Sequence, residues 1–272
     1  MQESLNSLVD RLVAGDVQVD PAGVYRRLRA EAPVHWHEGM QVWMLTRYDD
    51  VRRVLRDSED FAPLTEGPGT PIFGRTILQM TGREHSRKTA IVARRMRNPR
   101  LLATELRANV ERRSEQLLDE LGAPGGVVDL KAAYTSPLPL AVITDLLDVP
   151  QGVHWVDWYD ALAAGGVGSI TGDVALRERA LRARDEVFAY IGPIIEERRR
   201  SPGSDLLSDV ASIEYEGVRL TQDEAQAFIA FLLTAGVETT DRVLSSLLAF
   251  LATEPALWQE LRADRSLALA AC

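Results

Sequence analysis

The most extended apolar pattern in the chain runs from Leu220 to Pro255. Its two halves, 225–237 and 243–252, are apolar on nearly every face of a helical projection. A helix that is apolar all round belongs in a protein core rather than on a surface. The pattern therefore predicts a long buried helix over about 222–253.

Both ends of this helix carry local signals. Thr221 and Glu224 have the spacing of a capping box, in which each side chain satisfies a backbone donor at a helix start. Pro255 marks the other end, because the residue before a proline is pushed out of helical geometry. The charge-free run between Glu224 and Glu238 is 13 residues long. A membrane span needs about 17 residues or more, so this helix is not expected to cross a membrane.

A polar cluster interrupts the middle of the helix, where Ala235 and Gly236 precede Glu238 and Thr239. Glycine in a helix costs about 1 kcal/mol relative to alanine, and an unpaired buried carboxylate costs more. Glycine also lets a flat ligand approach the backbone, and a carboxylate beside a hydroxyl can pass protons to it. The alternative is a kinked core helix whose threonines bond back to the preceding turn and whose Glu238 pairs with an arginine.

The remaining patterns predict a mainly α fold with a small N-terminal β-hairpin. The predicted helices cover 21–31, 51–55, 81–96, 106–121, 137–147, 153–162, 173–200 and 256–262, and the hairpin pairs 34–37 with 42–45. In the short helix at 51–55, Leu55 is expected to face inward. The run Gly165–Gly168 predicts a flexible break, and Gly192-Pro193 a kink. His35 and His37 share one face of a strand without a visible third metal ligand.

Composition narrows the functional classes. The chain has 272 residues, 46% of them hydrophobic, and a net charge of −9, which argues mildly against nucleic acid as a partner. Its one cysteine, Cys272, permits no internal disulfide and suits a reducing cytosol. Residues 1–16 contain acids and no continuous apolar core, so they predict neither a secretory signal nor a membrane anchor. We expect a cytoplasmic protein.

A second capping box, Thr81 with Glu84, predicts the start of the helix over 81–96. One stripe of this helix at helical spacing consists of His85, Thr89, Val92 and Met96. The spacing predicts that His85 and Thr89 point inward.

The motif Ala235-Gly236-x-Glu238-Thr239-Thr240 resembles the oxygen-binding helix of the cytochrome P450 family, in its soluble bacterial branch. The lead-in from Leu220, the run Asp205–Ser208 and the layout of Pro21–Val34 match that family too. The resemblance implies a cytochrome P450-like helical fold around a heme. It implies an oxidoreductase that inserts one oxygen atom from dioxygen into a small organic substrate. Ala235 and Gly236 would then open a groove for dioxygen, and Glu238 and Thr239 would deliver protons.

The resemblance also assigns His85 to a heme propionate. The family pattern is His-x-x-x-Arg, and Thr89 stands where the arginine would be. Arg87 cannot replace it, because two positions along a helix correspond to about 200° around the axis. A hydrogen bond to a charged group is worth about 1.5–3 kcal/mol, so heme should be held less tightly. The alternative is a histidine bonded to backbone near the helix start.

Seven basic residues lie between Arg83 and Arg100: Arg83, Arg87, Lys88, Arg94, Arg95, Arg97 and Arg100. Such a run is usually a solvated helix face. In the family this side receives an acidic ferredoxin-type electron donor, and opposite charge would steer that encounter. Nucleic acid is not expected there, since no aromatic residues interleave with the basic ones.

The family's iron-binding cysteine lies in a Phe-x-x-Gly…Cys-x-Gly pattern that this sequence lacks. Cys272 has none of those neighbours, so no metal ligand is assigned. The resemblance covers 1–272 as a single partial domain, about two-thirds of a family member and truncated before the heme-thiolate loop. We therefore expect the chain alone to be inactive, with apolar faces of its long helix uncovered. The alternative is a non-enzymatic helical scaffold that binds an apolar ligand or a protein partner.

Overall fold

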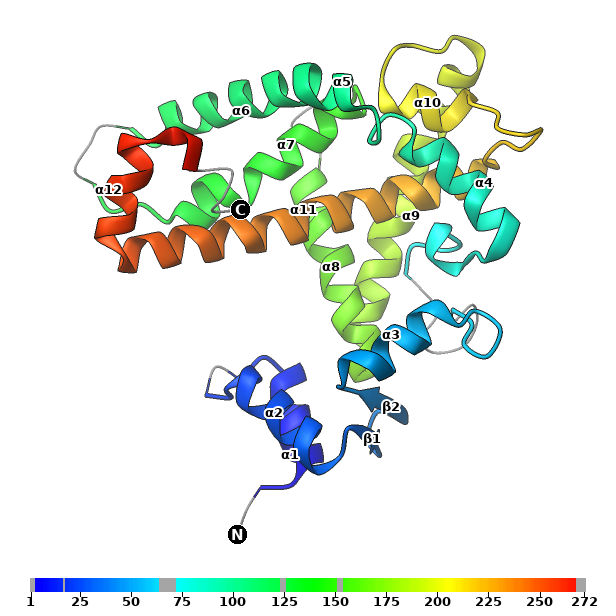
Figure 1. The fold of residues 1–272 in the computed structure, drawn as a ribbon. Coiled ribbons are helices and arrows are strands. Elements are labelled where there is room, and N and C mark those ends of the chain that lie inside the picture. The colour runs from blue at the N-terminus through cyan, green and yellow to red at the C-terminus, as the bar shows by residue number, and fades with distance from the viewer. Residues whose placement is uncertain (1–2, 17, 64–71, 123–125, 151–153, 268–272) are drawn as a thin grey trace. The chain divides into compact units, whose positions relative to one another are not determined.

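The computed structural model describes residues 3–16, 18–63, 72–122, 126–150 and 154–267. Across these ranges the chain is mainly helical, with one two-stranded antiparallel sheet, as predicted (Figure 1). The elements in chain order are α1 (Leu5–Val13), α2 (Pro21–Glu31), β1 (Val34–His37), β2 (Val42–Leu45), α3 (Tyr48–Arg56), η1 (Ile77–Gln79), α4 (Gly82–Ala93), α5 (Pro99–Leu101), η2 (Leu102–Leu106), α6 (Arg107–Glu120), η3 (Lys131–Thr135), α7 (Pro137–Leu146), α8 (Trp155–Thr171), α9 (Val174–Arg200), α10 (Leu206–Ser212), α11 (Gln222–Thr253), α12 (Pro255–Ala263) and η4 (Arg265–Leu267).

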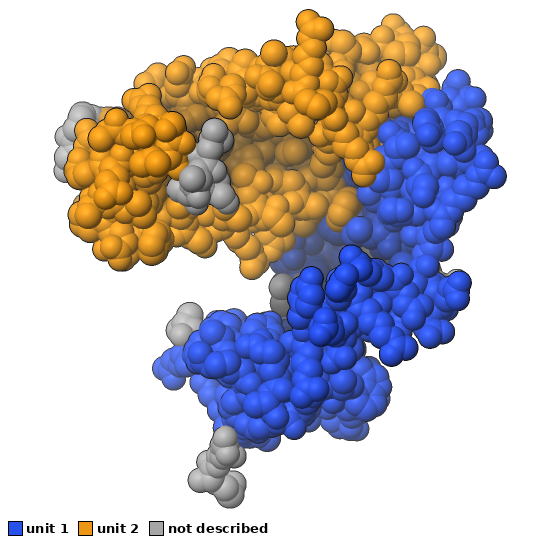
Figure 2. All heavy atoms as spheres, in the orientation of Figure 1, with its two compact units in different colours: residues 1–91, 157–194, 214–230 blue, residues 92–156, 195–213, 231–272 orange. Residues whose placement is uncertain are grey.

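The chain divides into two compact units, coloured separately in Figure 2. Unit 1 contains Met1–Ile91, Asp157–Ile194 and Glu214–Ala230, and unit 2 contains Val92–Val156, Ile195–Ile213 and Phe231–Cys272. The division passes through α11, so the start of this helix belongs to unit 1 and its polar cluster to unit 2.

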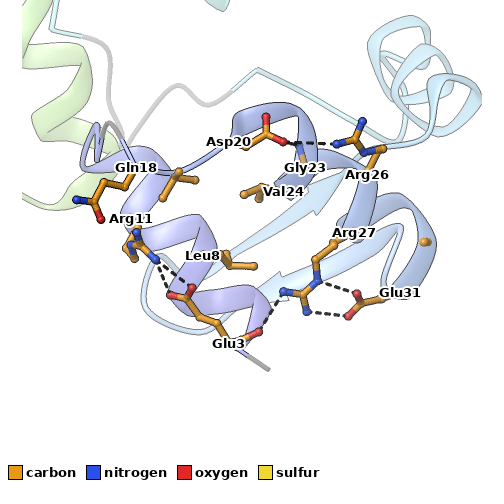
Figure 3. Close-up of a pocket in the computed structure, with 12 residues that line it drawn as sticks. Glu3, Leu8, Arg11, Gln18, Asp20, Gly23, Val24, Arg26, Arg27 and Glu31 are labelled. Atoms are coloured by element: carbon orange, nitrogen blue, oxygen red, sulfur yellow. Dashed lines mark hydrogen bonds and ion pairs between the residues drawn. The ribbon is translucent and has the colours of Figure 1, made fainter. Parts of the chain in front are cut away.

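In unit 1, α1 and α2 close over a small core of Val9, Val19, Val24 and Leu28. The Asp20 side chain caps α2 by accepting hydrogen bonds from the Ala22 and Gly23 N–H groups. A groove of about 660 Å³ runs along these two helices. Figure 3 shows that its charged rim is paired internally, with Glu3, Glu31 and Asp20 each facing an arginine.

The hairpin pairs Val34 with Leu45 and His37 with Val42. His35 and His37 share a face, as predicted, and both bind α1. His35 Nε2 lies 2.7 Å from Asn6 Oδ1. His37 is fully buried, and its Nδ1 accepts the Met40 N–H at 3.1 Å. The hydrogen bonds of His35 and His37 to Asn6 make the pair a contact between the hairpin and α1. The described residues contain no cluster that could hold a metal ion.

The glycine run in α8 is helical, so the predicted break at Gly165–Gly168 is wrong. A Cβ at Gly165 would lie 2.2 Å from the Ala180 Cβ of α9. The absent side chain therefore allows two helices of unit 1 to approach closely. Flexibility is not the reason for this glycine.

Helix α9 contains Pro193 yet is assigned as helix from Val174 to Arg200. Proline removes a backbone donor from a helix interior. Two side chains of α11 bind carbonyls in this stretch: Gln226 Nε2 donates to Phe188 O at 2.7 Å, and Gln222 Nε2 donates to Gly192 O at 3.1 Å. These contacts tie α9 to the first turns of α11 in unit 1.

Helix α11 has the predicted bounds, but its burial changes along its length. Ala225, Ile229 and Leu233 are fully buried, whereas Val243 is 60% and Phe250 53% exposed. The prediction of a helix buried on nearly every face is thus wrong for the second half. The exposure of Val243 and Phe250 agrees with the expectation that apolar faces of this long helix are uncovered. Leu55 of α3, predicted to face inward, is 81% exposed.

No helix in the described part of the chain combines the length and apolar character that a membrane crossing requires.

Candidate functional site

Helix α11 begins at the predicted capping box. The Glu224 N–H donates to Thr221 Oγ1 at 3.2 Å, and the Thr221 N–H donates to Glu224 Oε2 at 2.9 Å. Lys88 of α4 forms an ion pair with the same carboxylate, and both residues are 8% exposed. Burial would raise the pKa of Glu224, but the hydrogen bonds from Lys88 and Thr221 lower it overall. A charged, fully bonded contact thus fixes the start of α11 in unit 1.

The polar cluster of α11 lies in unit 2, within one continuous helix. Thr239 Oγ1 donates to Ala235 O at 2.8 Å, and Thr240 Oγ1 donates to Gly236 O at 2.9 Å. Glu238 Oε1 accepts from Arg242 at 2.5 Å. These contacts are those of the alternative interpretation, with back-bonded threonines and a carboxylate paired to an arginine. They occur without any break in the helix.

Thr239 is exposed, whereas Ala235, Gly236 and Glu238 are partly buried. Thr239 lies four residues after Ala235, so the two share one face of the helix. Since the hydroxyl proton of Thr239 goes to Ala235 O, its oxygen presents free lone pairs to whatever lies over this face. Arg242 is exposed, so its pairing with Glu238 is screened and exchangeable. The cluster can accept and pass protons at the helix surface.

Gly236 has a packing role that its sequence position did not indicate. A Cβ on this residue would lie 3.0 Å from Ile143 Cδ1 of α7. The bare backbone of α11 therefore rests on α7 within unit 2. Of the predicted groove pair, Ala235 is the member that shares a face with Thr239.

Asp241 was missed by the sequence analysis. It is 4% exposed, and it binds Lys131 Nζ at 2.6 Å and Thr135 Oγ1 at 2.7 Å. Burial would raise its pKa, but the hydrogen bonds from Lys131, Thr135 and Ser245 together lower it. One signal was available: Asp241 lies four residues after the buried Val237, on the face of the helix that is in the core.

His85 is exposed, so the prediction that it points inward is wrong. Val92 of the predicted stripe is buried, but its buried neighbours on α4 are Lys88 and Ile91. Thr89 is partly buried, and its hydroxyl has no hydrogen-bond partner among the described residues. The predicted inward face of α4 was rotated away from the observed one, because Lys88 was expected to face solvent. Lys88 is instead buried by its pairing with Glu224.

The capping box predicted at Thr81 does not form among the described residues, because the Glu84 carboxylate is engaged elsewhere. Glu84 turns toward Arg75, with two contacts of 2.6 Å, and toward Lys88 at 3.2 Å. The capping box in this region is formed by Thr76, which precedes η1, and Gln79 of η1.

Several residues of the basic stretch are paired within the molecule. The pairs are Arg83 and Arg87 with Glu216, Lys88 with Glu84 and Glu224, and Arg95 with Glu105 and Asp209. Arg94, Arg97 and Arg100 are exposed and have no ion pair with any residue that the structure describes. The free positive charge of this stretch is thus confined to three arginines in unit 2.

Comparison with known proteins decides the family. The family model described as Cytochrome P450 matches residues 173–270. The cytochrome P450 monooxygenase PikC of Streptomyces venezuelae is 34% identical over 268 residues, which cover 93% of this chain and 61% of PikC. The chain belongs to the cytochrome P450 family.

Two further P450 relatives support this assignment. Pulcherriminic acid synthase of Bacillus subtilis is 30% identical over 94% of this chain and 63% of its own length. CYP109E1 from Bacillus megaterium, solved in complex with testosterone, superposes with a TM-score of 0.74 at 28% identity, covering 91% of this chain and 64% of that one. The chain therefore spans less than two thirds of the length of these P450 relatives.

The residues present fit a P450 heme only in part. The surface of α11 with Ala235 and Thr239 presents small side chains, as a wall against a flat ring requires. The exposed His85 is available to donate a hydrogen bond to an anionic group, but Thr89 supplies no guanidinium beside it. Cys272 lies outside the described residues, and these contain no cysteine. No ligand for a heme iron is therefore assigned.

Proposed function

We propose that this chain is the oxygen-activating part of a heme-dependent P450 monooxygenase. The observation that carries the proposal is the surface of α11, where Thr239 is exposed beside partly buried Ala235 and Glu238 in a member of this family. The reaction consumes dioxygen, two electrons and two protons, places one oxygen atom in the substrate and releases the other as water. Heme, when bound, would supply the iron at which dioxygen is reduced.

The chain's own residues would handle protons at that surface. Thr239 Oγ1 already donates to Ala235 O, so its lone pairs can accept a hydrogen bond from a ligand or water while its proton stays ordered. Glu238 is held by an exposed arginine, which connects its carboxylate to solvent. We assign Glu238 to proton supply, and Thr239 to accepting a hydrogen bond from the water or ligand that receives the proton. Ala235 would leave room for dioxygen beside the helix.

The substrate in this proposal is a small apolar organic molecule. The similar CYP109E1 holds testosterone, which is of that class. The electron donor would be an acidic ferredoxin-type protein. Its contact would use Arg94, Arg97 and Arg100, the members of the basic stretch left without an ion pair among the described residues. A cytoplasmic location belongs to the same proposal, because a single cysteine leaves no internal disulfide to form.

A hybrid protein tests this function. Residues 1–267 would be joined to the C-terminal third of PikC, loaded with heme, reduced and exposed to carbon monoxide. We expect the absorbance band of a thiolate-bound heme in the hybrid, and no such band in the 272-residue chain alone. If the hybrid folds and takes up no heme, the proposal is wrong and the non-enzymatic scaffold becomes the better account.

A further inference from the structure

Asp241 is a buried carboxylate on α11, three residues beyond Glu238. Its two oxygen atoms have different partners. Oδ1 accepts from Thr135 Oγ1 at 2.7 Å and from Ser245 Oγ at 3.1 Å. Oδ2 accepts from Lys131 Nζ at 2.6 Å. A buried charge is tolerated only when such contacts satisfy it, so the local structure depends on them.

The contacts of Oδ1 are the stronger constraint. Thr135 is 1% exposed, and its hydroxyl also lies 2.7 Å from Ser245 Oγ, so two hydroxyl protons are shared among three mutually close oxygen atoms. The Lys131 side chain is 62% exposed, so water and salt screen its pairing with Oδ2. The buried hydroxyls, rather than the lysine, should therefore determine where Asp241 sits.

An unusual backbone turn presents these partners. Lys131–Thr135 forms a π-helix, in which the Ser136 N–H donates to Lys131 O at 3.1 Å. Pro137 follows and has no N–H to continue an ordinary α-helical ladder. The wider turn places Lys131 and Thr135 on one side, and both reach Asp241. Single π-turns of this kind occur frequently at functional sites.

A second contact holds α11 to the same segment. Gly236 packs on Ile143 of α7, where a Cβ would lie a tight 3.0 Å from Ile143 Cδ1. Gly236 and Asp241 lie on either side of Glu238 and Thr239 in the sequence. The proton-handling pair is thus bracketed by two anchors to one continuous stretch of unit 2, η3 and α7.

We propose that Asp241 is a positioning residue, which fixes the rotation of α11 so that Glu238 and Thr239 keep their orientation. A helix rotation of about 20° moves a Cα by about 0.8 Å at a radius of about 2.3 Å. A misplacement of about 1 Å can lower a catalysed rate about 100-fold. We call the contacts of Asp241 with Lys131, Thr135 and Ser245 the clamp. The clamp is a property of the fold, and only its role in catalysis rests on the proposed function.

Hydrogen exchange of the 272-residue chain, resolved by peptide, tests the clamp. In Asp241→Ala, the amides of 238–242 should exchange at least about tenfold faster, because three hydrogen bonds to a charged group are lost. Asp241→Asn keeps an acceptor for Thr135 and should stay within about threefold of the parent. Lys131→Met should accelerate the exchange less than Asp241→Ala does, since that contact is partly screened.

Asp145→Ala is the matched control. This carboxylate pairs with Arg112 and Arg113 of α6 and lies in the same unit. Its loss should speed exchange in α6 and leave 238–242 unchanged. If Asp241→Ala does not fold, Thr135→Val removes one Oδ1 contact and keeps the charge, and it should still accelerate 238–242.

Three results would overturn the proposal. They are unchanged exchange in both Asp241→Ala and Thr135→Val, equal acceleration in Asp241→Asn and Asp241→Ala, or acceleration of 238–242 by the control. None of these measurements requires heme. A failure of the proposed function would appear in the spectrum of the hybrid and leave the exchange pattern intact, so the two failures are distinguishable.

Discussion

Two adjacent glycines of α8 should respond oppositely to the same substitution. A Cβ at Gly165 would lie 2.2 Å from the Ala180 Cβ and 3.2 Å from Ile72 Cγ1, whereas a Cβ at Gly166 would have no atom of the described residues within 4 Å. Carbon atoms in contact are normally about 3.5–4.0 Å apart. The first contact is therefore short by about 1.3–1.8 Å. Neither the Cβ added at Gly165 nor the Cβ of Ala180 can rotate away, because both are attached directly to helical backbone.

The magnitude follows from two opposing effects. Replacing a helical glycine by alanine gains about 1 kcal/mol in helix propensity. Overpacking a core costs about 1–3 kcal/mol and occasionally more, and a backbone-borne clash belongs at the upper end. We expect Gly165→Ala to lower the free energy of unfolding by about 2 kcal/mol, which corresponds to a fall in Tm of about 4–8 °C at this size. Gly166→Ala should raise stability by about 0.5–1 kcal/mol.

Urea denaturation followed by circular dichroism measures both variants against the parent chain. The double variant Gly165→Ala, Ala180→Gly moves one methyl group from α9 to α8 across the same contact. It should therefore recover most of the stability that Gly165→Ala loses. The reasoning is refuted if Gly165→Ala is as stable as the parent, or if Gly166→Ala is the more damaging change.

Three other predictions concern ionic and apolar contacts of unit 1. Lys88→Met should cost about 3 kcal/mol, because it leaves the buried carboxylate of Glu224 with only the longer ion pair to the exposed Arg75, at 3.4 Å. Adding Glu224→Gln should restore part of the loss in urea denaturation. The hydrogen bonds from Arg75 lower the pKa of Glu84 to about 2. The ionised Glu84 therefore stabilises the folded chain fully above about pH 4.5, and this stabilisation disappears as the pH falls toward 2. Glu84→Gln should accordingly reduce the loss of stability on acidification in a stability–pH curve. Leu55→Ser should change the unfolding free energy by less than about 0.5 kcal/mol, and a larger loss would contradict the exposure of α3.

The bounds of α11 could be predicted because the signals that set them are local. A capping box, a proline and an apolar run each act within a few residues. The relation between Ala235 and Thr239 was equally predictable, because helical geometry alone puts them on one face. Both facts follow from the sequence without knowledge of any partner segment.

The errors came from partners distant in the sequence. Lys88 was expected in a basic, solvated face, but Glu224, 136 residues away, draws it into the interior. Gly165 was interpreted as part of a flexible break, whereas Ala180 of the next helix packs against it. Asp241 carried no motif, and its meaning depends on Thr135, which reaches it across 106 residues. Hydrophobic periodicity predicts an element, but it does not say which polar residue meets a buried partner.

The most direct test of the account uses the heme-loaded hybrid and counts products for each electron pair consumed. Dioxygen that is reduced but not cleaved leaves as hydrogen peroxide, so the ratio of oxygenated substrate to peroxide reports proton delivery. We expect mostly oxygenated product from the parent hybrid, and mostly hydrogen peroxide from Thr239→Ala and Glu238→Gln with an unchanged heme spectrum. An unchanged ratio in both variants would contradict the assignment of these two residues.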